Sequence, residues 1–544
     1  MLSGSSKKRT LIFLLPFIIA ALIMLPRLIS PQFGFFDDAR MLAQSKTLLQ
    51  GDFSMSHDKE AGRFRPVYWL YYTVIYFFAG YRPFWFFIGH LLIFFILLYE
   101  LRLILKDMGF SDLQILITSL IFILTMPIIE NFYTLSKGEP LQLLFILAAV
   151  IVSYQGNSPA RFDYKRILLS AFAILMAILV KETAIVMLPI FFLWTLINFL
   201  FRKSDPKQSY KLSLSLLISA ILAVGAYFLL RSLWGATALL GGGYTDRYQF
   251  EVISLTQKIL RWATQFAFYF HYLLPIIFLL VLLLFFYKNA LSDKEKRFLF
   301  IWSTWSLLWY GILIPWEYAE LYYLLPFGFG ISIILGIIIP PILKLINSGQ
   351  KIQRRLIMVL SILACVLFVL TLPNYVTDAN TQLTFDQIND DMLAFLTDYA
   401  SNDETIYINI QRSNEYSEKL EVYLREHYQL REITYDNIDA ELMETIDEET
   451  GAVILMPFIK NQPRLTVRAG VEEAYQRQWN EKLLETTESK REPIEEFERS
   501  FRISNINLPV LICPILGNRG FCENPDPIID TRLFVYGWEI FEIK

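Results

Sequence analysis

The chain has 544 residues, 55% of them hydrophobic and only 19% charged, which excludes an ordinary soluble protein with about 45–50% apolar and about 25% charged residues. The net charge of −3 combines two unlike parts: residues 374–544 carry 16 Lys/Arg and 33 Asp/Glu, a net −17, which leaves 33 basic and 19 acidic residues, a net +14, for residues 1–373. We therefore predict a transmembrane domain over 1–373 and a soluble domain over 374–544.

Apolar stretches long enough to cross a hydrocarbon core of about 30 Å recur through the first domain. The first one follows Lys7-Lys8-Arg9 without a small-residue cleavage pattern, so we interpret it as a signal anchor. Basic residues then concentrate in every second loop, which predicts the N-terminus inside and residues 374–544 outside the cytoplasm. The eleven predicted spans are 10–29, 83–104, 113–130, 140–154, 166–181, 184–201, 212–231, 264–287, 298–315, 321–346 and 356–372.

One further apolar stretch, 66–80, is short and rich in Tyr and Trp. Such residues favour the membrane–water interface, and counting this stretch as a span would move every later basic loop outside. We therefore predict a juxtamembrane helix within a first extracytoplasmic loop over 31–82.

Over residues 374–544, apolar runs rich in β-forming residues alternate with helical patterns. This alternation predicts a small α/β domain. Helices are expected at 385–400 and 414–428, strands at 405–410, 430–435, 452–458 and 533–541, and a helical or partly mobile stretch at 472–502. Cys513 and Cys522 are compatible with a disulfide or with two buried thiols, and the Cys and His spacings predict no metal site.

An acidic pair, Asp37-Asp38, comes directly after the first span. A carboxylate there can act as a general base on a hydroxyl approaching from outside. It can equally cap the helix predicted over 39–50, since anions are stable at helix N-termini. The spacing alone favours neither interpretation.

Several cations fall on the same predicted outer side. Arg63 and Arg65 precede the juxtamembrane helix, where they can bind a phosphate or simply attract lipid headgroups. Lys137 and Lys181 occupy short outer turns, each with a glutamate nearby. Each lysine can close an ion pair with its glutamate or hold an anionic ligand.

Short motifs follow one another in order over about 10–330: Asp37-Asp38, then Gly51, Arg65-Pro66, Phe78-Ala79-Gly80, Ser136-Lys137-Gly138-Glu139-Pro140, Val180-Lys181-Glu182-Thr183 and Tyr322-Tyr323-Leu324-Leu325-Pro326. In this order, and on one membrane side, they resemble the integral-membrane GT-C glycosyltransferases, specifically the protein O-mannosyltransferase and aminoarabinose-transferase superfamily. Two departures stand out. Asp38 replaces a common glutamate, and Tyr322 replaces an arginine.

The resemblance implies transfer of a monosaccharide from a polyprenyl-phosphate donor to an extracytoplasmic acceptor, with inversion at the anomeric carbon. It implies an enzyme of the cytoplasmic membrane that needs no metal or other cofactor. The implied roles are the acid–base residue and its partner for Asp37 and Asp38, donor-phosphate binding for Arg65, Lys181, Arg63 and Lys137, and substrate contact for Glu139 and Tyr323.

Two other classes of function remain as alternatives. A lipid or glycan flippase or transporter also needs many spans, but it is expected to show charges in mid-span and broken helices in two related halves. A membrane-anchored scaffold displaying its acidic domain would leave Asp37, Lys137 and Lys181 free to vary.

Overall fold

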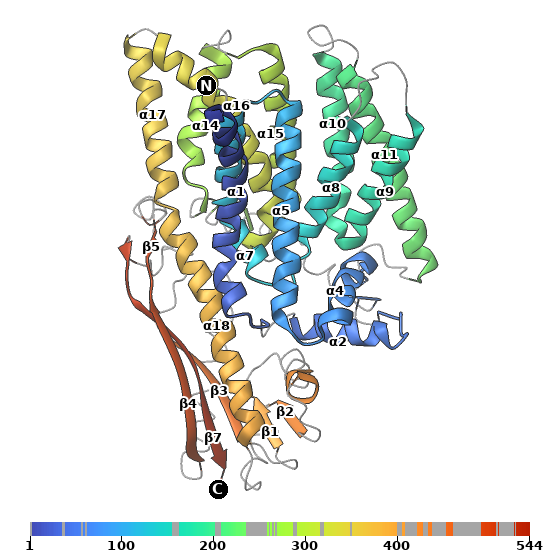
Figure 1. Ribbon diagram of the computed structural model, residues 1–544, viewed down its shortest axis with the longest axis vertical. Coiled ribbons are helices and arrows are strands. Elements are labelled where there is room, and N and C mark those ends of the chain that lie inside the picture. The colour runs from blue at the N-terminus through green and yellow to red at the C-terminus, as the bar shows by residue number, and fades with distance from the viewer. Residues whose placement is uncertain are drawn as a thin grey trace.

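The computed structural model shows a large bundle of helices with a small β-sheet at one end (Figure 1). The start of α1 (Ser3–Ile29) and the C-terminal sheet lie at opposite ends of the bundle. The residues that the structure describes are 3–34, 38–55, 58–59, 62–154, 163–201, 208–235, 258–259, 262–263, 266, 269–286, 291–315, 320–348, 351–399, 405–408, 422–427, 434–437, 453–460, 491–507, 510, 527 and 529–543.

Every predicted span coincides with helical structure in this part of the chain. After α1 the bundle contains α5 (Pro83–Asp107), α6 (Asp112–Ile123), α7 (Pro127–Phe132), α8 (Glu139–Tyr154), α9 (Tyr164–Val180), η1 (Glu182–Val186), α10 (Met187–Leu200), α11 (Gln208–Leu233), α14 (Leu273–Val281), η2 (Leu282–Phe286), α15 (Asp293–Gly311), η3 (Leu321–Leu324), α16 (Leu325–Ser348) and α17 (Lys351–Val369).

Within the described residues, six helical stretches are long and apolar enough to cross a membrane. They are Thr10–Ile29, Pro83–Asp107, Glu182–Leu200, Ser209–Leu233, Leu321–Asn347 and Arg354–Tyr399. The chain is therefore a polytopic α-helical membrane protein, as predicted. The total of eleven spans and the orientation in the membrane stay predictions.

Local sequence signals explain where several helices begin. Ser111 and Ser292 each form a capping box, with Gln114 and Glu295 respectively, and so satisfy backbone N–H groups that lack a partner in the first turn. Proline begins α4 (Pro66–Ala79), α5 and α7, where its missing N–H costs nothing.

Two helices of the first loop, α2 (Asp38–Leu49) and α4 (Pro66–Ala79), pack against each other across the end of the bundle nearest the sheet (Figure 1). Both were predicted from the sequence. Helix α4 buries Tyr68, Trp69 and Tyr72 but exposes Phe77 and Phe78, at 65% and 82%. One face of α4 thus packs on protein while the other presents aromatic rings, as expected of an interfacial helix.

The C-terminal region contains a five-stranded mixed sheet of order β2-β1-β3-β7-β4. Strands β1 (Thr405–Ile408), β2 (Thr434–Asn437) and β3 (Val453–Lys460) are parallel, whereas β7 (Leu533–Ile543) runs antiparallel to β3 and to β4 (Arg491–Arg502). A two-stranded pair, β5 (Asn505–Ile506) and β6 (Ile529–Asp530), lies beside it, and η4 (Val422–His427) falls within the helix predicted at 414–428. The predicted α/β character is confirmed.

The prediction for 472–502 was wrong where the structure describes it, because 491–502 forms strand β4 rather than a helix. Ile494, Phe497 and Phe501 recur at intervals of three and four, which imitates a helix in the sequence. Pairing with the long strand β7 overrides that local pattern.

Helix α18 (Leu372–Tyr399) connects the two parts and runs as one element past the predicted boundary at 373. Asn374 exchanges hydrogen bonds with the backbone of Ile506, and Asn389 accepts from Tyr536 and Trp538. Helix α18 is therefore fixed to the C-terminal strands by side-chain hydrogen bonds. The division into two domains stays a prediction.

Candidate functional site

The second residue of the acidic pair, Asp38, is the first residue of α2 and is only 1% exposed. Its carboxylate accepts hydrogen bonds from two backbone N–H groups, Gly34 N at 2.7 Å and Ser136 N at 3.1 Å. The second contact reaches a loop about a hundred residues away. The carboxylate thus joins the first loop to the start of α8. Asp37 lies outside the described residues.

The loop that meets Asp38 connects α7 to α8 and is fixed by tyrosines of α4. Tyr68 OH donates to Ser136 O at 2.9 Å, and Tyr72 OH donates to Leu135 O. Gly138 allows the close approach, because a Cβ there would lie 3.3 Å from both Tyr68 Cδ2 and Val180 Cγ1. Tyr68 and Tyr72 of α4 therefore position this loop.

Lys181 lies at the junction of α9 and η1, and its Nζ forms an ion pair with Glu139 Oε1. The lysine side chain is 19% exposed and that of the glutamate 3%. The ammonium also lies 4.2 Å from the ring centroid of Tyr323, a cation–π distance. Gln142 fixes the junction by donating from Nε2 to Lys181 O at 2.7 Å. Lys181 can therefore pair with Glu139 and still bind an anion, since part of its side chain is accessible.

Lys137 joins this group, with its ammonium 4.1 Å from the ring centroid of Tyr322. Lys181 approaches the same ring at 5.1 Å. The Tyr322 backbone is fixed by α7, since its N donates to Glu130 and its O accepts from Asn131. We call Lys137, Glu139, Lys181, Tyr322 and Tyr323 the Lys–Glu–Tyr cluster. Tyr322, which replaces an arginine of the resemblance, therefore faces two lysines.

The cluster combines the positive charges of Lys137 and Lys181 with the negative charges of Glu139 and of Glu320, whose carboxylate lies beside Tyr322 and Tyr323. The negative charge of Glu139 and the positive charges of Arg63 and Lys137 all act on the Lys181 ammonium. Arg63 thus belongs electrostatically to the same site. An anion entering the cluster would be stabilised by these cations. Within the described part of the chain, Glu139 Oε2 and Ser136 Oγ are buried without a hydrogen-bond partner.

Arg65 makes a different contact from the one predicted. Its Nη2 lies 2.5 Å from Asp58 Oδ1 and its Nε 3.2 Å from Asp58 Oδ2, while Trp69 Nε1 donates to the same carboxylate at 2.6 Å. Burial opposes ionisation of Asp58, yet Arg65 and these hydrogen bonds keep its pKa below the ordinary value. The Arg65 guanidinium is therefore already paired with a carboxylate of this chain. Phosphate binding by Arg65 stays a prediction.

The structure brings together Asp38, Arg63, Lys137, Glu139, Lys181 and Tyr323 from five distant stretches of sequence. Sequence reasoning missed Asp58 and Glu130, because no spacing signal connects a loop carboxylate to a partner set by tertiary structure. Cys513 and Cys522 lie outside the described residues. Among the residues that are described, no three His, Cys, Asp or Glu side chains are placed to hold a metal, and the expectation of no cofactor stays a prediction.

Comparisons with known proteins give matches in structure only. No family model and no curated protein matches the sequence. Solved structures that match include ArnT from Cupriavidus metallidurans bound to undecaprenyl phosphate, at 10% identity over 81% of this chain and 92% of that one, with a TM-score of 0.47. The apo state of the same ArnT matches at 10% identity over the same shares, with a TM-score of 0.48.

The oligosaccharyltransferase of Archaeoglobus fulgidus matches at 10% identity over 76% of this chain and 63% of that one, with a TM-score of 0.44. Both proteins are GT-C glycosyltransferases, the group that the motifs resemble. TM-scores below 0.5 indicate only a limited similarity in backbone fold. The case for a function therefore rests on the side chains described above.

Proposed function

We propose that this chain is a membrane glycosyltransferase that transfers a monosaccharide from a polyprenyl-phosphate donor to an acceptor outside the cytoplasm. The observation that carries the proposal is the convergence of a buried carboxylate, Asp38, with two lysines at one site. Ser136, which donates its N–H to Asp38, directly precedes Lys137, and Lys137 shares the Tyr322 ring with Lys181. An acidic pair that includes the base, held beside an anion site, is what this reaction requires.

The chemistry is a single displacement at the anomeric carbon. A carboxylate of the acidic pair takes the proton of the acceptor hydroxyl, whose oxygen then forms the new bond to that carbon. The bond from carbon to phosphate oxygen breaks on the opposite side, so the configuration inverts, and the phosphate leaves with the electron pair. Lys181, Lys137 and Arg63 stabilise the charge that develops on it.

Two buried oxygens of the site can orient the sugar. Glu139 Oε2 and Ser136 Oγ are without a partner in the described part of the chain, next to the lysines. Buried polar groups favour hydrogen bonding, so sugar hydroxyls suit this place. In this proposal Asp37 is the base and Asp38, which holds the segment against the Ser136 loop, its partner. The site faces the outer side of the cytoplasmic membrane.

A donor panel tests the proposal. Purified protein in nanodiscs receives radiolabelled polyprenyl-phosphate sugars, and loss of sugar from the lipid is followed for the wild type, Asp37→Asn and Asp38→Asn. We expect one donor to be consumed and both variants to lose about 10²- to 10⁴-fold in rate. Asp112→Asn is the matched control, since Asp112 also begins a helix but is 40% exposed and pairs with Arg102.

Each outcome separates the alternatives. If both variants keep the wild-type rate, the acidic pair is not catalytic. If the wild type neither consumes nor binds any donor, with or without a crude acceptor extract, a transporter or a scaffold becomes the better proposal. Donor binding without turnover would show that the acceptor is missing from the extract.

A further inference from the structure

The segment that carries the acidic pair is fastened from two sides by the C-terminal part of the chain. Gly34 O accepts a hydrogen bond from Tyr423 OH of η4 at 2.7 Å, while Gly34 N donates to Asp38 Oδ2 at 2.7 Å. The same glycine therefore connects the tyrosine to the carboxylate through its two backbone groups. Tyr423 is 3% exposed, so its hydroxyl reaches the glycine from within the packed interior.

Helix α18 provides the second fastening. A Cβ on Gly34 would lie 3.2 Å from Asp38 Oδ2 and 3.4 Å from Asp386 Oδ1, so both carboxylates lie next to the position that a side chain on this glycine would occupy. Asp386 is itself fixed by an ion pair with Arg27, at 2.5 Å, and this arginine is fully buried. Substitution of Gly34 by any larger residue would press on both carboxylates.

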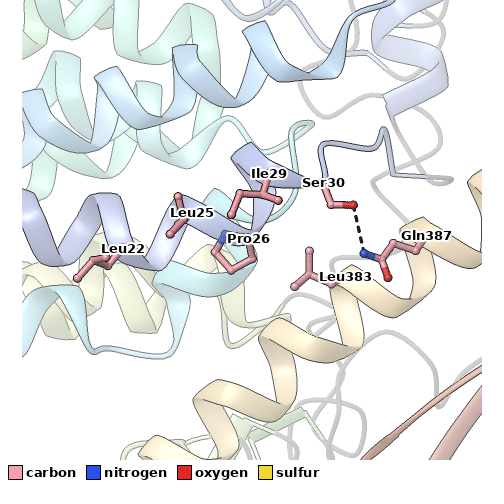
Figure 2. A pocket seen from close by; sticks show the side chains of 7 residues that line it. All are labelled: Leu22, Leu25, Pro26, Ile29, Ser30, Leu383 and Gln387. Carbon is pink, nitrogen blue, oxygen red and sulfur yellow. Dashed lines mark hydrogen bonds between the residues drawn. The ribbon is translucent and has the colours of Figure 1, made fainter.

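The end of α1 is tied to the same helix just before this segment begins (Figure 2). Gln387 Nε2 donates to Ser30 Oγ at 3.3 Å, at the polar end of a groove of about 400 Å³ that is otherwise lined by apolar residues such as Leu25, Ile29 and Leu383. Both ends of 30–34 are thus attached to residues beyond 380. The position of residues 30–34 therefore depends on these contacts as well as on helix α1.

From these contacts we infer that the C-terminal region positions the catalytic segment, with Tyr423 and Asp386 acting on Asp38 through Gly34. This inference rests on the proposed function for its catalytic consequence. Tyr423 and Asp386 are positioning residues, because the contacts through which they act are with Gly34 and Arg27 and not with a reacting group. The soluble region therefore contributes to the rate of transfer and does more than cover the outer loops.

The experiment compares Tyr423→Phe, which removes one hydroxyl, with Tyr375→Phe as control. Tyr375 OH also donates to a backbone carbonyl, Ile123 O at 3.2 Å, but belongs to the part of α18 that faces α6. Hydrogen–deuterium exchange of a peptide covering 31–42 is measured on the full chain in nanodiscs, together with kcat and donor KM. For Tyr423→Phe we expect faster exchange and a fall in kcat of about 3- to 10-fold, with KM changed by less than about twofold.

A second variant guards against misfolding. Gly34→Ala keeps both backbone hydrogen-bonding groups and is expected to lower kcat in the same way, because the methyl group moves Asp38. In an Asp38→Asn background, Tyr423→Phe is expected to have no further effect on the residual rate, since both act through one carboxylate. An additive effect would overturn the inference.

The two proposals can fail separately. Unchanged exchange in Tyr423→Phe overturns the positioning role whether or not the chain is an enzyme. Faster exchange with wild-type kcat in an active protein also overturns it, because the contact then has no catalytic consequence. Faster exchange in a protein that uses no donor leaves the contact in place but removes the proposed function, and with it the catalytic role of Tyr423.

Discussion

The ion pair between Lys181 and Glu139 leads to a prediction that separates a structural lysine from one that binds the donor. Lys181→Met keeps an unbranched side chain that is one atom shorter but leaves the Glu139 carboxylate, 3% exposed, without its charge partner. Breaking a buried pair in this way costs about 3–5 kcal/mol, and we expect about 3 kcal/mol because Lys181 is 19% exposed. The double variant Lys181→Met/Glu139→Gln removes the unpaired charge and is expected to recover most of this loss.

Donor affinity is expected to behave differently from stability. A charged hydrogen bond to phosphate contributes about 1.5–3 kcal/mol, so both the single and the double variant are expected to bind the donor about 10- to 150-fold more weakly. Thermal unfolding in detergent measures the first quantity and equilibrium binding of the labelled donor the second. If the double variant recovers wild-type affinity together with stability, Lys181 only closes an ion pair and our assignment is wrong.

Two further predictions concern the elements that hold the site. The pKa of Asp58 is lowered in the folded protein, so its pair with Arg65 stabilises the fold above the ordinary value of 3.8 and this contribution is lost as pH falls through the folded pKa. The difference in melting temperature between wild type and Asp58→Asn is therefore expected to shrink from about pH 5 to about pH 3, and a constant difference would contradict the assigned ion pair. Gly138→Ala is expected to cost about 1–3 kcal/mol, because its Cβ would lie 3.3 Å from Tyr68 and Val180. Gly225→Ala in α11 meets nothing within 4 Å and serves as the control, and equal melting temperatures for the two variants would refute the packing argument.

The contact pattern also bears on the departure at Tyr322. Two lysines, Lys137 and Lys181, lie within cation–π distance of its ring. The cations of the proposed phosphate site therefore come from the loop before α8 and from the end of α9 rather than from the position before Tyr323. A missing arginine at 322 does not leave the site without positive charge.

The sequence by itself determined the helical, membrane-spanning architecture, because the length of an apolar run and the sign of flanking charges act locally. It also located α2 and α4 and placed Lys137, Glu139 and Lys181 near the ends of helices. These features depend on neighbours in the chain, such as the proline that begins α4 or the aromatic rings on its exposed face. For the same reason the local pattern misled at 491–502, where pairing with β7 decides the structure.

Only the tertiary structure decided which charges meet. Arg65 and Asp58 are seven residues apart, yet nothing in the loop between them indicates that the carboxylate turns back onto the guanidinium. Asp38 meets Ser136, and Tyr423 meets Gly34, across separations of 98 and 389 residues. Such partners are fixed by how helices pack and where a loop is held, and the energy of each contact depends on burial. Burial is a property of the folded chain that no spacing in the sequence contains.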